Sequence, residues 1–403
     1  MAMKKKVFII LAIIITASMV SYKIWMESPS YKMVLERRGA GSSPSDNGIT
    51  VNSSPESTKT TKCTSESTVE YFTYKQTDPL WKENNKFGLY IYAEESKMFD
   101  IAKKLVNSNG GQWGYVLIPF NVKDRDSTKW SRVFTQLVEK KLIPIIQLWD
   151  VDTSSFKEQT KGAAEFLNGF LWPIKYRYIS VYNETNDSKF WYGKVDPEEY
   201  AEILDYTIKA FKSKNQDFFM MNGALNVTAG TDGLNMDAFL YMKKMNEKVD
   251  GIFEKLDGWA SHPYPQPNFA GSPKTEGRWG IRAYDDELKF LKDELGVKKD
   301  LPVFITETGW AHAEGENYNA SYLPVKTVAE YFKTAYKDYW LKDDRVRAVI
   351  PFTVRYDAPF DHFSWVNADN VPYYHYDVIK DMEKVKGEPP SLEKSLMKVD
   401  NCE

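Results

Sequence analysis

The stretch YISVYNE at residues 178–184 decides the predicted fold of this chain. Its β-branched and aromatic residues are typical of a buried strand, and its polar end predicts the start of a loop. A second stretch, VFITETGW at residues 303–310, has the same arrangement. Each stretch therefore places one glutamate, Glu184 or Glu307, at the carboxyl end of a buried strand. A charged side chain is costly there unless it has a partner or a role.

Eight apolar runs of this kind occur in order and alternate with amphipathic segments that predict helices. Near-continuous apolar runs are typical of parallel strands that are covered on both faces. The alternation predicts an α/β fold, a (β/α)8 TIM barrel, with a doubly wound open sheet as the alternative. That alternative needs a glycine-rich phosphate loop after the first strand, where the sequence has AEES at residues 93–96. The predicted strands are 87–93, 114–122, 142–149, 177–184, 217–225, 256–264, 301–310 and 346–356, and the predicted helices include 96–108, 130–141, 197–213, 237–246, 284–295 and 325–341.

The sequence predicts four regions: a targeting segment at 1–26, a flexible linker at 27–78, the barrel at 79–383 and a C-terminal extension at 384–403. In the first region, Lys4, Lys5 and Lys6 precede an apolar run, which is the pattern of a cleaved secretory signal or an uncleaved signal anchor. The anchor is favoured because Met19 stands where a cleavage site prefers a small residue. Both alternatives predict an exported, extracellular barrel, and the anchor also predicts attachment to the membrane. The linker prediction rests on the many Ser, Thr, Gly and Asn residues between 39 and 68.

The composition bears on partners, disulfides and metal sites. Lys plus Arg is 53 and Asp plus Glu is 56, so the net charge of -3 argues against nucleic acid as a partner. The two cysteines, Cys63 and Cys402, predict a disulfide between linker and tail in an exported protein, with two free thiols as the alternative. The four histidines are scattered and have no metal-ligand spacing, so no metal or other cofactor is predicted. Nothing in the sequence predicts an oligomeric state.

The two glutamates point to a glycosidase. Barrels of this class carry their active site at the carboxyl ends of the strands, and the fourth and seventh strands lie nearly opposite in a ring of eight. Glu184 and Glu307 are therefore predicted to face each other across the opening. Two carboxylates about 5–5.5 Å apart hydrolyse O-glycosidic bonds with retention, by double displacement through a covalent intermediate.

Asn183 and Glu184 after the fourth strand, with Glu307 at the end of the seventh, resemble clan A of the glycoside hydrolases, which includes families 5 and 39. The resemblance implies that Glu184 is the acid/base, that Glu307 is the nucleophile, that Asn183 binds the sugar 2-hydroxyl and that the substrate is a β-linked oligo- or polysaccharide. The stretch SHPY at residues 261–264 resembles the His-x-Tyr of family 5. It implies that His262 and Tyr264 bind the substrate near the nucleophile and that Tyr264 helps to keep the nucleophile ionised.

The sequence departs from family 5, because no arginine ends an early strand near the nucleophile. The resemblance is therefore to the clan and not to one family. Trp149, Trp310 and Trp365 each follow a predicted strand and are predicted to stack on sugar rings, with core packing as the alternative. A non-catalytic barrel that binds carbohydrate or cell wall remains an alternative function. A metal-dependent hydrolase is a third, but it lacks His and Asp ligands at the strand ends.

Overall fold

The computed structural model describes residues 65–74, 84–387, 389 and 392–401. The compact unit Ser67–Val399 contains the barrel, and the second unit comprises Met1–Glu66 and Asp400–Glu403. The predicted targeting segment, most of the predicted linker, Cys63 and Cys402 lie outside the described residues. None of the helices in the described ranges has the length and apolar character that crossing a bilayer requires.

Within residues 84–387, eight parallel strands form a closed barrel. Five make one sheet in the order β2-β3-β4-β5-β6, and three make another in the order β7-β8-β9. Isolated parallel bridges from Met221 to Gly258 and from Phe87 to Val349 join the edges of the two sheets, so the ring closes and the prediction of a barrel is confirmed. The strands are β2 Gly88–Tyr90, β3 Gly114–Asn121, β4 Leu142–Trp149, β5 Arg177–Val181, β6 Phe218–Asn222, β7 Trp259–Ser261, β8 Val303–Thr308 and β9 Val346–Pro351.

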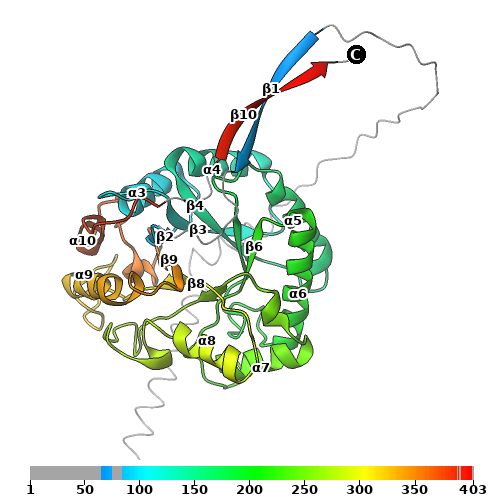
Figure 1. Cartoon of the computed structure of the whole chain (residues 1–403). Helices are drawn as coiled ribbons and strands as arrows, with labels where there is room; N and C mark the ends of the chain where they lie inside the picture. Colours follow the sequence, from blue (N-terminus) through cyan, green and yellow to red (C-terminus); the bar gives the residue numbers. More distant parts are fainter. Residues whose placement is uncertain (1–64, 75–83, 388, 390–391, 402–403) are drawn as a thin grey trace, which may run out of the picture. The chain divides into compact units, whose positions relative to one another are not determined.

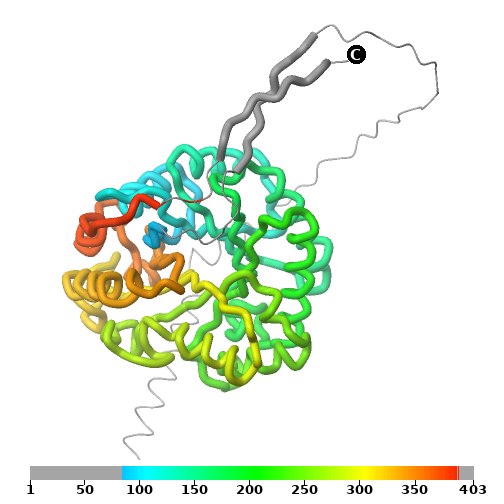
Figure 2. The backbone as a smooth tube through the Cα atoms, viewed as in Figure 1, coloured from blue at the N-terminus to red at the C-terminus, as the bar shows by residue number. Residues whose placement is uncertain are grey.

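One α-helix follows each of these strands, and the helices surround them in a ring (Figure 1). The chain passes once around this ring, so that its last helix lies beside its first, where Tyr376 donates a hydrogen bond to the Ile101 carbonyl at 2.8 Å (Figure 2). The third and the last of these helices, α5 and α10, were not among the helices predicted from the sequence. The helices are α3 Ser96–Val106, α4 Ser127–Lys140, α5 Phe156–Asn168, α6 Pro197–Lys214, α7 Ala238–Lys248, α8 Tyr284–Asp293, α9 Val325–Thr334, extended by the π-helical turn Ala335–Trp340, and α10 Tyr374–Lys380.

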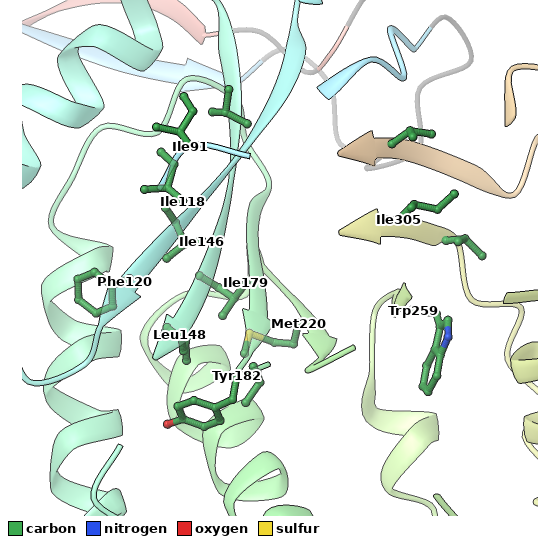
Figure 3. Packing of buried hydrophobic residues seen from close by; sticks show 14 of the residues in the cluster. Ile91, Ile118, Phe120, Ile146, Leu148, Ile179, Tyr182, Met220, Trp259 and Ile305 are labelled. Atoms are coloured by element: carbon green, nitrogen blue, oxygen red, sulfur yellow. The ribbon is translucent and has the colours of Figure 1, made fainter. Parts of the chain in front are cut away.

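The barrel strands bury side chains on both faces, which explains their near-continuous apolar sequences. On β3, Tyr115 and Leu117 belong to a cluster inside the barrel, whereas Val116 and Ile118 belong to the layer between strands and helices. Figure 3 shows this outer layer, in which Ile118 and its counterparts on neighbouring strands lie side by side. Because the interior is filled by large side chains, a substrate can reach only the two ends of the barrel.

A separate two-stranded sheet pairs β1 (Ser65–Tyr74) with β10 (Leu392–Asn401). The predicted linker at 27–78 and the predicted extension at 384–403 therefore each contain a strand. The linker prediction rested on composition between 39 and 68. The following stretch VEYFTY at residues 69–74 is rich in residues that favour strands.

Candidate active site

Glu184 lies on a tight turn after β5. The strand ends at Val181, and both Tyr182 (φ 70°) and Glu184 (φ 37°) adopt the left-handed conformation. That conformation costs a non-glycine residue roughly 1–2 kcal/mol, and such residues concentrate at functional sites. The Glu184 amide donates to the Ala224 carbonyl at 2.8 Å, which attaches the turn to the segment after β6.

Tyr200 on α6 holds the start of this turn from behind. Its phenol is fully buried, donates to the Val181 carbonyl at 2.9 Å and accepts from the Gly223 amide at 2.7 Å. A β-carbon on Gly223 would lie 2.5 Å from the Val181 carbonyl oxygen, so glycine allows the ends of β5 and β6 to approach each other. The position of Glu184 thus depends on a side chain that is remote from the chemistry.

We expect Tyr200→Phe to lower the free energy of unfolding by about 1–3 kcal/mol, because the Gly223 amide and the Val181 carbonyl lose their shared buried partner. Urea denaturation followed by tryptophan fluorescence measures this change. Tyr206→Phe, on the same helix, is the matched control, since Tyr206 makes an edge contact with Phe156 at 5.5 Å between ring centroids. Equal stability of the two variants would contradict the anchoring role of the Tyr200 hydroxyl.

An irregularity in β8 directs Glu307 into the barrel. Ile305 pairs with Val349 and Thr308 with Pro351, so β8 contains one residue more than β9 between these pairs. Ile305 faces the helices, and strict alternation would turn Glu307 toward them as well. The extra residue shifts the alternation, and Glu307 Oε2 instead accepts a hydrogen bond from Tyr264 at 3.1 Å.

Both carboxylates lie close to one imidazole, that of His262. His262 Nδ1 lies 3.0 Å from Glu184 Oε1 and 3.9 Å from Glu307 Oε2. The two carboxylate oxygens therefore lie no farther apart than the sum of these distances. That limit includes the ~5–5.5 Å separation of retaining enzymes and the lower end of the ~6.5–9.5 Å range of inverting ones.

Burial dominates the electrostatics of the site. It raises the pKa of Glu307 to about 7; the charge of Glu184 also raises it, whereas His262 and hydrogen bonds from Tyr264 and Gln147 act to lower it. For His262, burial opposes the imidazolium, but the charges of Glu307 and Glu184 outweigh it and raise its pKa. The resemblance implied that Tyr264 helps to keep Glu307 ionised, and its hydrogen bond acts in that direction, whereas burial acts against it.

Gln147 is a site residue that the sequence analysis missed. It is fully buried at the carboxyl end of β4, donates to Asn183 Oδ1 at 3.0 Å and also hydrogen-bonds to Glu307. Asn183 is thereby joined to the carboxylate pair, next to which the sequence placed it. The available signal was that Gln147 is the one polar residue in the strand LIPIIQLW.

The three predicted sugar platforms differ in position. Trp149 is partly exposed and makes an edge contact with Phe190 at 6.3 Å between ring centroids. Trp310 and Trp365 are each 1% exposed and pack on Phe332, with centroid distances of 4.9 and 5.0 Å. A sugar ring cannot stack on these two without displacing Phe332, so the structure places them in the core and corrects their assignment as platforms.

More exposed aromatic rings lie elsewhere on loops at the carboxyl ends of the strands. Trp279, in the segment after β7, is 52% exposed, and Tyr92, after β2, is 43% exposed.

In the described part of the chain, no three His, Cys, Asp or Glu side chains gather as metal ligands. A hollow of about 350 Å³ lies near Phe218 and Pro302, at the amino ends of the strands, and so at the opposite end from the carboxylates.

No protein family and no curated protein matches the sequence, but solved structures resemble its fold. Two β-glucuronidase structures from Bacteroides uniformis, one a calcium-binding mutant of β-glucuronidase 2, have TM-scores of 0.51 and 0.50. Both are 10% identical to this chain, covering 77% of it and 36% and 37% of their own chains. This chain thus spans little more than a third of theirs, and the likeness supports the barrel fold alone. A GH128 endo-β-1,3-glucanase from Pseudomonas viridiflava is 13% identical, with a TM-score of 0.48, over 74% of this chain and 98% of that one.

Proposed function

We propose that this protein is a retaining glycoside hydrolase that cleaves O-glycosidic bonds, with β-linked oligo- or polysaccharides as substrates. The observation that carries the proposal is the convergence of Glu184 and Glu307 on His262 at the carboxyl ends of the barrel strands. Both Bacteroides uniformis proteins that share the fold are glycosidases by name. Membership of clan A is part of this proposal.

The proposed reaction has two steps. Glu307 attacks the anomeric carbon and forms a glycosyl ester, while Glu184 gives its proton to the departing oxygen. Glu184 then takes a proton from water, and the resulting hydroxide attacks the anomeric carbon and releases the Glu307 carboxylate. Each step inverts the anomeric centre, so the product keeps the configuration of the substrate.

The surroundings of the two carboxylates support these roles. Glu307 accepts hydrogen bonds from Tyr264 and Gln147, and donors of this kind stabilise a carboxylate that must be ionised to attack. Glu184 contacts His262 and retains 13% side-chain exposure beyond the end of β5. A leaving group or a water molecule can reach it there. Asn183 is next in the chain and is proposed to bind the sugar 2-hydroxyl.

The pH dependence of kcat/KM should reflect the raised pKa of Glu307. The nucleophile must be ionised, so we expect kcat/KM to rise with pH through an apparent pKa of about 7 and to be lost at lower pH. Initial rates on an aryl β-glycoside, whose leaving group needs little protonation, measure this limb. An acid limb near 4.5, the ordinary value for Glu, would contradict the raised pKa of Glu307.

The anomeric configuration of the first product tests the reaction class. Proton NMR during hydrolysis of β-linked glycans should show the β-anomer before mutarotation, and a 2-fluoro glycoside should label Glu307 as a covalent ester. An α-anomer would mean inversion and would remove the nucleophile role from Glu307. If the wild-type protein binds glycans but hydrolyses none, it is the alternative, a non-catalytic carbohydrate- or cell-wall-binding barrel.

We also propose that the barrel acts outside the membrane. The segment 1–26 either anchors it there or is cleaved off as a secretory signal. The three lysines and the apolar run that follows support this location. Protease digestion of intact cells that express the full chain should remove the barrel or leave it in the medium. A barrel that is protected until the cells are lysed would contradict export.

A further inference from the structure

Gln147 has partners for the whole hydrogen-bonding capacity of its side chain. Its Oε1 accepts from Trp149 Nε1 at 2.7 Å and from the Tyr90 hydroxyl at 3.4 Å. Its amide nitrogen donates to Asn183 Oδ1 at 3.0 Å and hydrogen-bonds to Glu307. A primary amide offers two acceptor sites and two N–H groups, so none is left over. Since the residue is fully buried, water cannot replace a lost partner.

The chemistry of the partners determines which way this amide faces. The indole N–H of Trp149 can only donate, so it must face the oxygen of Gln147. The hydrogen bond between Gln147 and Glu307 lowers the pKa of Glu307, so Gln147 is the donor and its nitrogen faces Glu307. Trp149 and Glu307 therefore impose the same orientation from opposite sides, and the alternative orientation would face a donor with a donor and an acceptor with an acceptor.

The orientation of the Gln147 amide determines that of the Asn183 amide. The nitrogen of Gln147 faces Asn183 and requires the oxygen of that amide, so the N–H₂ of Asn183 is the side that can face a ligand. Asn183 is nearly buried, at 5% exposure, and no acceptor for that N–H₂ occurs among residues 84–387. An N–H₂ group there suits a sugar hydroxyl that accepts a hydrogen bond.

We propose that Gln147 is the positioning residue of this active site, which holds Glu307 and sets Asn183 to offer a donor to the substrate. This inference rests on the proposed glycosidase function. Gln147 supplies a neutral donor to the Glu307 carboxylate from the carboxyl end of β4. A neutral donor lowers the pKa of a carboxylate less than a cation does, which agrees with the pKa of about 7 at Glu307.

The test is Gln147→Glu, which changes shape little but replaces both N–H groups by acceptor lone pairs. We expect kcat to fall about 10²–10³-fold, as for the loss of an oriented donor at a reacting group, with the acid limb of kcat/KM shifted up by about one pH unit or more. Gln216→Glu, an exposed residue at the opposite end of the barrel, is the matched control and should leave both unchanged. Unchanged kcat and an unchanged acid limb in Gln147→Glu would overturn the proposal.

A second readout separates this inference from the proposed function. With ¹³C-labelled glutamate, NMR follows the titration of the carboxyl that is lost in Glu307→Gln, whether or not the protein hydrolyses a glycan. This readout uses Gln147→Met, which removes the donors without adding charge, because a carboxylate at position 147 would raise the pKa of Glu307 by repulsion alone. A higher pKa of Glu307 in Gln147→Met supports the positioning role, and an unchanged pKa overturns it. If Gln147→Glu does not fold, the kcat of Gln147→Met provides the rate test in its place.

Discussion

Glu307→Gln is expected to lower kcat by at least about 10⁴-fold on every substrate, because an amide cannot form the glycosyl ester and the double displacement stops at its first step. The fold should survive, since Gln can still accept the hydrogen bond from Tyr264. Steady-state rates measure the loss, and a melting curve checks that the variant is folded. Glu294→Gln, an exposed glutamate just after α8, is the matched control and should keep the wild-type rate.

An added nucleophile distinguishes this role from a structural one. In Glu307→Gly, azide can enter the space that the carboxylate leaves and attack the anomeric carbon from the same face. A single displacement inverts the centre, so the product should be an α-glycosyl azide from a β-glycoside. Activity of Glu307→Gln within about tenfold of wild type would remove Glu307 from the covalent step.

Glu184→Gln should separate substrates by their leaving groups. Loss of general acid catalysis costs about 10²–10⁴-fold where the departing oxygen needs a proton, as it does for a sugar. An activated aryl group departs without one, so its release should remain fast in the first turnover. Because the base for water is also missing, the glycosyl ester on Glu307 should accumulate. The time course of aryl product release should therefore show a burst followed by a slow steady rate.

Azide again provides the control for this assignment. In Glu184→Ala it can attack the accumulated ester, and two displacements should give a β-glycosyl azide, the opposite anomer to that from Glu307→Gly. Near-full activity of Glu184→Gln on glycans with sugar leaving groups would refute the acid/base assignment. The same anomer from both variants would mean that the two roles are assigned incorrectly.

Local sequence patterns predicted most of the barrel. The run LIPIIQLW has the bounds of β4 in both sequence and structure, because it is apolar except for Gln147 and lies between a lysine and an aspartate. Helix α6 begins where Asp196 and Pro197 predict it, and the Asp196 side chain caps the Glu199 amide. The strands β5 and β7 end earlier than predicted, because Asn183 and His262 belong to the loops that build the site.

Contacts between distant segments decided what the patterns could not. The burial of Trp310 and Trp365 follows from Phe332 on α9, which packs on both rings. The inward direction of Glu307 follows from an extra residue in β8 relative to β9, a mismatch that exists only once the two strands pair.

The sequence by itself determined the order of strands and helices, the closed α/β architecture and the pair Glu184 and Glu307 at two strand ends, because these depend on the periodicity and type of neighbouring residues. Only the tertiary structure decided that His262 lies between the carboxylates, that Gln147 joins Glu307 to Asn183 and that the pKa of Glu307 rises to about 7. Distances across the barrel and the exclusion of water arise when the ring of strands closes, and no local pattern contains them.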